Sequence, residues 1–164
     1  MGLFRRKRMF VATDDGFDVE LDDEIRPWVL SLATQLDELL DADVEELRRL
    51  FPTAYPDDPE RDAGYQILAR QELIDSRREA IALMQETVAK PTLTGDELSA
   101  WMGIVNDLRL VLGTRLDVSE DDHDIDPDDP EAPLYILYHQ LGYLLSEIVD
   151  ALTGALPPPT DDTV

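Results

Sequence analysis

The clearest hydrophobic pattern in the chain lies at residues 98–116, where apolar positions recur at the spacing of an α-helix. At 100° per residue, one stripe is formed by Leu98, Trp101, Val105, Leu108 and Leu112. Ile104 and Val111 widen this apolar surface. A capping-box pattern, Thr94 followed by Glu97, comes just before it. The segment therefore predicts the central helix of the fold.

The start of the chain predicts a hairpin followed by a helix. Residues 8–13 and 17–21 flank an Asp-Asp-Gly turn, and apolar residues of the second segment alternate with acidic ones, as in a strand with one buried face. A helix is then expected to begin at Asp22 or Asp23, with Pro27 in its first turn. Its expected core positions are Ile25, Trp28, Val29, Leu32, Leu36, Leu39 and Leu40.

Two further helices are expected before the central one. A short helix over residues 44–51 should stop before Pro52, because the residue preceding a proline disfavours helical backbone. A longer helical region follows over residues 60–89. Its apolar side is formed by Ile67, Ile74, Ile81, Met84 and Val88. This length is unusual for a globular helix, which leaves open a break near Gln71.

The pattern as a whole predicts an all-α, mainly helical fold, in which a compact domain of about five helices carries a short N-terminal β-hairpin. After the central helix, residues 117–133 predict an acidic mobile loop and residues 134–152 the last helix. We expect residues 1–7 to be a flexible basic N-terminus and residues 8–154 to form the single helical domain. Residues 155–164 are expected to be a disordered, proline-rich acidic tail.

The distribution of charge limits the kind of partner. The chain has 164 residues and a formal net charge of −23. Four of its 14 basic residues are Arg5, Arg6, Lys7 and Arg8, which are a candidate partner-docking element. All 37 acidic residues lie beyond these four, so residues 9–164 carry −27 from 10 basic and 37 acidic residues. Because such a body repels phosphate, we expect no direct specific DNA binding and a basic protein surface as the partner.

Several classes of chemistry are absent from the sequence. The chain has no cysteine, which excludes disulfides, thiolate metal sites and thiol catalysis within it. No run approaches the roughly 18 apolar residues of a membrane span, and the first residues lack a signal-peptide core, so we expect a cytoplasmic protein. We expect no catalytic residue, metal site or cofactor, since His123 and His139 lie in separate segments and no phosphate-binding loop is present. Gly103 and Gly113 are expected to allow close packing of the central helix.

Polar residues beside the apolar stripes form the candidate site. They are Asn106, Asp107 and Arg109 on the central helix and Asp75, Arg77 and Arg78 on the preceding one. Arg109 lies within the apolar arc, so we expect it to need a carboxylate or several carbonyl oxygens as partners. The set fits an ion-pair network between helices. The alternative is a ligand site in which the arginines bind a carboxylate or phosphate.

Four segments, in their order along the chain, resemble a known family. They are Leu47-Arg48-Arg49-Leu50-Phe51-Pro52, residues 72–78, residues 98–116 with Trp101 and the run 105–110, and the tyrosine-rich residues 134–145. Together they resemble an actinobacterial family of unknown function, numbered two thousand and seventeen, which includes oxidative-stress transcription regulators of the AosR type. The resemblance extends over residues 10–154.

This resemblance implies a non-enzymatic regulatory protein that acts by protein–protein contact, with a sigma factor or other transcription machinery as partner. A link to ClpS and Clp proteolysis is the alternative, because genes of the family often neighbour that of the ClpS adaptor. A small-ligand receptor or enzyme that uses Arg77, Arg78 or Arg109 is a third reading, and a homodimer stays open. Redox sensing by AosR-type proteins is proposed to rest on paired N-terminal cysteines, where this chain reads Arg5-Arg6-Lys7-Arg8-Met9.

Overall fold

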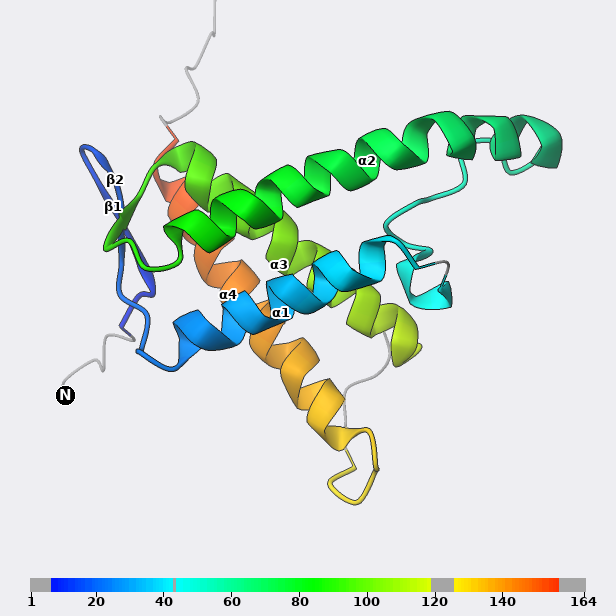
Figure 1. Ribbon diagram of the computed structural model, residues 1–164. Helices are drawn as coiled ribbons and strands as arrows, with labels where there is room; N and C mark the ends of the chain where they lie inside the picture. The colour runs from blue at the N-terminus through cyan, green and yellow to red at the C-terminus, as the bar shows by residue number, and fades with distance from the viewer. Residues whose placement is uncertain (1–6, 43, 119–125, 157–164) are drawn as a thin grey trace, which may run out of the picture.

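The computed structural model describes residues 7–42, 44–118 and 126–156, and it is mainly helical with a small sheet near the N-terminus (Figure 1). The elements in chain order are β1 (Phe10–Thr13), β2 (Gly16–Val19), α1 (Ile25–Leu40), the 3₁₀ helix η1 (Glu45–Leu47), α2 (Pro59–Thr87), β3 (Thr92–Leu93), α3 (Gly95–Arg115) and α4 (Ala132–Gly154). The predicted helical fold with an N-terminal hairpin is therefore confirmed. The expected terminal segments fall largely outside the described residues, at 1–6 and 157–164.

The sheet has three antiparallel strands in the order β1-β2-β3. The predicted hairpin is present, with Phe10 opposite Val19. Its turn requires glycine at Gly16, where φ is +149° and an added Cβ would lie 2.3 Å from the carbonyl oxygen of Leu93. Strand β3 was not predicted from the sequence, because its two residues, Thr92 and Leu93, are too few to show a period.

Helix α1 begins at Ile25, slightly later than predicted, and has Pro27 in its first turn as expected. Of its predicted core stripe, Val29, Leu36 and Leu40 are fully buried, and the other positions are partly buried against the core. The predicted short helix over residues 44–51 is wrong in both type and length. It is the single 3₁₀ turn Glu45–Leu47, which buries Leu47 and is followed by a loop that ends at Asp58.

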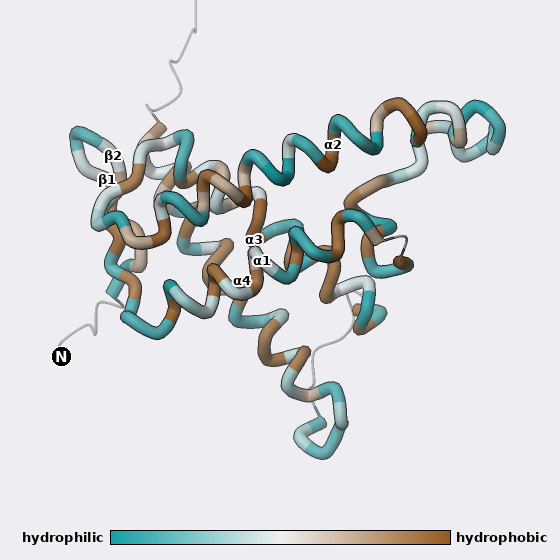
Figure 2. The backbone as a smooth tube through the Cα atoms, in the orientation of Figure 1, coloured by the Kyte–Doolittle hydropathy of each residue, from teal (hydrophilic) through white to brown (hydrophobic). Residues whose placement is uncertain are grey.

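Helix α2 is continuous from Pro59 to Thr87, with no break at Gln71, and is capped by the Asp58 carboxylate, which accepts from the Arg61 N–H at 3.0 Å. Its N-terminal half projects beyond the other helices (Figure 1). The expectation that Ile67 lies in the core is therefore wrong, because this residue is 78% exposed. The loop before α2 contacts this part of the helix on another face, where Gln66 donates to the Pro52 carbonyl oxygen at 3.1 Å. In Figure 2 a hydrophobic stretch, coloured brown, lies on the projecting part of α2.

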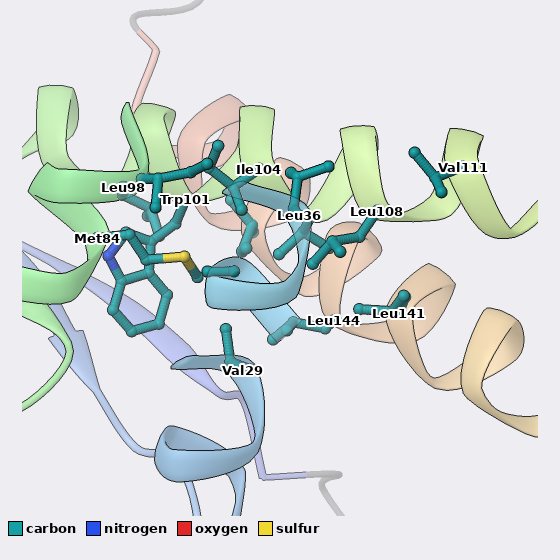
Figure 3. Packing of buried hydrophobic residues seen from close by; sticks show 14 of the residues in the cluster. Val29, Leu36, Met84, Leu98, Trp101, Ile104, Leu108, Val111, Leu141 and Leu144 are labelled. Carbon is teal, nitrogen blue, oxygen red and sulfur yellow. The ribbon is translucent and has the colours of Figure 1, made fainter. Parts of the chain in front are cut away.

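Helix α3 is the central helix, as predicted, and it packs against α2, α4 and η1. Its capping box is formed as expected, with Thr94 and Glu97 each accepting from the other's backbone N–H. Trp101 is completely buried in the core close to Met84 and Leu98 (Figure 3), and its ring contacts the ring of Phe10 edge-on at 6.2 Å. No described helix is long and apolar enough to cross a membrane.

Candidate functional site

Arg77 is the most completely bonded of the candidate arginines. It projects from the middle of α2, and its Nε donates to the Asp107 carboxylate of α3 at 3.0 Å. The guanidinium also donates to the carbonyl oxygens of Leu73 at 3.3 Å and Leu50 at 3.2 Å. The side chain therefore joins α2, α3 and the segment after η1, and its donors face atoms of the chain itself.

Asp107 accepts this bond inside the fold, with its side chain only 13% exposed. Burial raises the pKa of the Asp107 carboxyl above its ordinary value, and the neighbouring Arg77 guanidinium opposes that rise. Burial is the larger effect. The pair therefore places α2 and α3 relative to each other while the Asp107 charge itself costs stability, which is typical of partly buried ion pairs.

Arg78 belongs to a second ion-pair cluster on another side of α2. It donates to Asp37 at 2.9 Å and to Asp41 at 2.6 Å, both at the C-terminal end of α1. These bonds raise the pKa of the Arg78 guanidinium further above its ordinary value. Because Arg77 and Arg78 point to α3 and α1 respectively, they do not converge on one pocket.

Arg109 lies partly buried between α3 and α4, and its partner differs from the expected carboxylate or carbonyls. It donates to the Tyr138 hydroxyl at 3.1 Å and stacks over the same ring at 4.5 Å. Its buried Nε has no hydrogen-bond partner among the described residues. A Cβ at Gly142 would lie 3.1 Å from this atom, so the glycine gives α4 room for the guanidinium.

The other predicted site residues lie apart from these contacts. Asp75 is exposed and accepts from Gln71 on its own helix at 2.8 Å. It lies two positions before Arg77, which places it on the far side of α2 from that arginine. Asn106 is exposed on α3. Of the predicted docking residues, Lys7 pairs with Glu20 at 3.4 Å and Arg8 is exposed. Arg5 and Arg6 lie outside the described residues.

The structure also contains a groove that sequence reasoning did not identify. It has a volume of about 750 Å³ and is lined by Met9, Glu24, Ile25, Trp28, Ile136, His139, Gln140, Tyr143 and Leu144. None of the three candidate arginines lines it. One signal was present in the sequence: Ile136 lies off the leucine stripe of the last helix, where an isolated apolar residue has no core to join.

No three His, Asp or Glu side chains lie close enough together to hold a metal ion within residues 7–42, 44–118 and 126–156. His139 is exposed at the edge of the groove. His123 lies outside the described residues.

Comparison with known proteins gives a family and named relatives. Residues 7–152 match DUF2017, a domain of unknown function. The chain is also similar to the oxidative stress regulator AosR of Mycobacterium tuberculosis (strains H37Rv and CDC 1551) and of Mycobacterium bovis. Each is 32% identical over 127 residues, which cover 66% of this chain and 58% of the relative.

The chain thus spans little more than half the length of these curated relatives. No solved structure matches it. The family match includes every helix and strand of the fold except the last two residues of α4. It also contains the Arg77–Asp107 pair and the groove residues described above. The chain therefore belongs to the DUF2017 family.

Proposed function

We propose that this protein is a non-enzymatic regulator that acts by binding another protein, in transcriptional control of a stress response. The observation that carries the proposal is that all three candidate arginines are bonded to side chains of the chain itself. Arg77 and Arg78 are engaged by carboxylates of the chain itself, and Arg109 by Tyr138. A receptor or enzyme for an anion needs such cations free in a pocket, and the groove contains none of the three.

Similarity to the AosR proteins supports the regulatory part of the proposal, since these relatives are named oxidative stress regulators. The partner class follows from charge. A body of net charge −27 over residues 9–164 favours a basic protein surface over the phosphates of DNA. A cytoplasmic sigma factor or another transcription component is the partner that we propose, and the ClpS and Clp system is the second candidate.

This chain has no cysteine, so its regulation does not use a thiol of its own residues. The regulation that we propose is therefore a binding event on the helical surface. The protein binds a partner, and the bound partner changes its activity.

The test combines direct binding with transcription. The purified chain is immobilised, and RNA polymerase core, each sigma factor of the source organism and ClpS are passed over it separately. We expect one transcription component to bind, with affinity that falls between about 0.05 and 0.3 M salt because screening weakens charge attraction. Addition of the chain should then change promoter-specific transcription in a reconstituted reaction.

Two results would contradict the proposal. One is tight, sequence-specific DNA binding in a gel shift without any partner. The other is a small metabolite recovered from the natively purified protein, with affinity lost on substitution of Arg109 by methionine. Binding to ClpS alone would assign the protein to the second candidate function.

A further inference from the structure

We propose that the groove between α1 and α4 binds a segment of the partner protein that carries a large apolar side chain flanked on one side by lysine or arginine residues. This rests on the proposed function, because it specifies the surface and the partner chemistry of the same protein–protein contact. It goes beyond the family resemblance, which points to no surface.

The geometry of the groove supplies an apolar floor. Helices α1 and α4 both pack against α3 but run in different directions (Figure 1), and they have no extensive contact with each other. Leu144 is buried at the floor and reaches from α4 toward α1 (Figure 3). Trp28 and Met9 are partly buried along the walls, and Ile136 is 50% exposed at the mouth.

The chemistry of the lining fits a protein segment better than a small molecule. Tryptophan and methionine are enriched at protein interfaces, whose centres are apolar and whose rims are polar. Here the polar lining residues Glu24, His139 and Gln140 are all exposed, so they lie at the rim. A small-molecule site instead buries most of its ligand and directs a few polar groups into the pocket.

Charge selects the flanking residues of the bound segment. Glu24 lines the groove, and the exposed Asp22 and Asp23 precede it at the start of α1. The nearby cation Arg26 is turned away, since it donates to the carbonyl oxygens of Val88 and Lys90. The α1 side of the groove is therefore acidic, and it complements a lysine or arginine flank on the bound segment.

The same charge argues against a second copy of the chain as the occupant. Each copy carries a formal net charge of −23, so the overall charge opposes the approach of two copies. Of the two described cations that precede the lining residue Met9, Lys7 is paired with Glu20 at 3.4 Å and Arg8 is exposed, so they offset little of this charge. A basic partner removes this repulsion and adds attraction.

The test uses the full chain and a labelled synthetic peptide. The peptide has leucine and phenylalanine four residues apart on a helical scaffold and lysines at one end, and a second peptide replaces the lysines by glutamates. We expect saturable binding of the first by fluorescence anisotropy and at least about tenfold weaker binding of the second. Equal affinities for the two peptides would overturn the basic-flank assignment.

A matched pair of variants locates the site. Ile136→Arg places a cation at the mouth of the groove, whereas Val149→Arg makes the same change at a position 40% exposed on the same helix that does not line the groove. We expect Ile136→Arg to weaken peptide affinity at least about tenfold and Val149→Arg to leave it within about twofold. Equal affinities in the two variants, with unchanged circular dichroism, would overturn the assignment of the groove.

A second matched pair tests the charge. Glu24→Gln should weaken binding of the lysine peptide and flatten its salt dependence, whereas Glu38→Gln, 14 residues further along α1 and outside the groove lining, should change neither. An identical salt dependence in both variants would contradict the charge argument.

Other occupants give distinct outcomes. A peptide that binds only after removal of residues 1–6 would assign the groove to the chain's own N-terminus. Self-association that Ile136→Arg abolishes would assign it to a second copy. Either result overturns the proposal. If a native partner complex survives Ile136→Arg, the assignment of the groove as the binding site is overturned, while the proposed function stands. If no partner complex forms at all, the proposed function is overturned, while the peptide result stands.

Discussion

The indole Nε1 of Trp101 donates a hydrogen bond to the Thr87 hydroxyl oxygen at 2.9 Å, and both side chains are completely buried. The Thr87 hydroxyl donates in turn toward the Leu83 carbonyl, 2.7 Å away. One hydroxyl therefore joins the end of α2 to the first turns of α3. It satisfies the single polar atom of the largest side chain in the core.

Replacing Thr87 by valine should lower the free energy of unfolding by about 1–3 kcal/mol, because the shape is retained while the indole N–H loses its acceptor. Urea unfolding measures the change. The control is the same substitution in a Trp101→Phe background, where no N–H remains and the cost should be smaller by about 1 kcal/mol or more. Strictly additive effects would show that the bond contributes nothing.

The contribution of Asp107 to stability should increase as pH falls, which is the opposite of the usual behaviour of a paired carboxylate. Burial raises the pKa of its carboxyl in the folded state, so the folded protein takes up a proton at a higher pH than the unfolded chain does. Between that raised pKa and the ordinary value of about 3.9, the stability of wild type relative to Asp107→Asn should rise as pH falls. Urea midpoints of both proteins across this window test it. A relative stability that falls toward acid would mean that attraction to Arg77 outweighs burial.

Glu97 should show the opposite behaviour. The Lys90 ammonium and the Thr94 backbone N–H lower the pKa of the Glu97 carboxyl, so its ionised form stabilises the folded state. The advantage of wild type over Glu97→Gln should be complete above the ordinary pKa of about 4.3 and lost as pH falls through the lower folded value. Thermal melting of both proteins from pH 7 downward measures it. A constant difference at all pH values would remove the charge from the explanation.

The two glycines inside α3 should respond differently to alanine. A Cβ at Gly103 meets nothing within 4 Å, so Gly103→Ala should raise stability by about 0.5–1 kcal/mol through its helix propensity. A Cβ at Gly113 would lie 3.2 Å from the Arg49 guanidinium and 3.3 Å from the Tyr138 ring. Gly113→Ala should therefore lose that gain or destabilise. Equal gains at both sites, by chemical denaturation, would contradict the packing described for Gly113.

Two isoleucines on one stripe of α2 should differ in how much they contribute to the free energy of unfolding. Ile74 is 5% exposed and Ile67 is 78% exposed, although the sequence places them seven residues apart on the same side. We expect Ile74→Ala to cost about 2–5 kcal/mol and Ile67→Ala to change the unfolding free energy by less than about 0.5 kcal/mol. A large loss at Ile67 would show that the projecting part of α2 is covered in solution.

Much of the fold follows from periodicity. The central helix, its capping box and the hairpin are all predictable, because each depends on residues that are neighbours in the sequence. The errors have physical causes. Ile67 carries the period of a core residue, but a period cannot show where the neighbouring helices end. Likewise Gly103 and Gly113 look equivalent in sequence, and only the positions of Arg49 and Tyr138 separate them.

The candidate site was less predictable. Helical spacing placed Asp107 and Arg77 near the interface of their helices, and the structure joins them. It could not decide the partner of Arg109, because an arginine stem reaches several neighbours and Tyr138 comes from a helix 29 residues away. The groove was beyond sequence reasoning for a similar reason. It exists only where α1 and α4 diverge, and no local pattern encodes that divergence.

The backbone N–H of Met9 donates to the Glu147 carboxylate at 3.0 Å, across 138 residues of chain. This contact sets an order of events during synthesis. The ribosome makes β1 and β2 before α4, and at about 5–20 residues per second the acceptor on α4 follows Met9 roughly 7 to 28 s later. Throughout that interval the hairpin lacks its α4 partner, and for more than the first half of it the hairpin also lacks β3. The hairpin therefore gains its β3 and α4 contacts only late in synthesis.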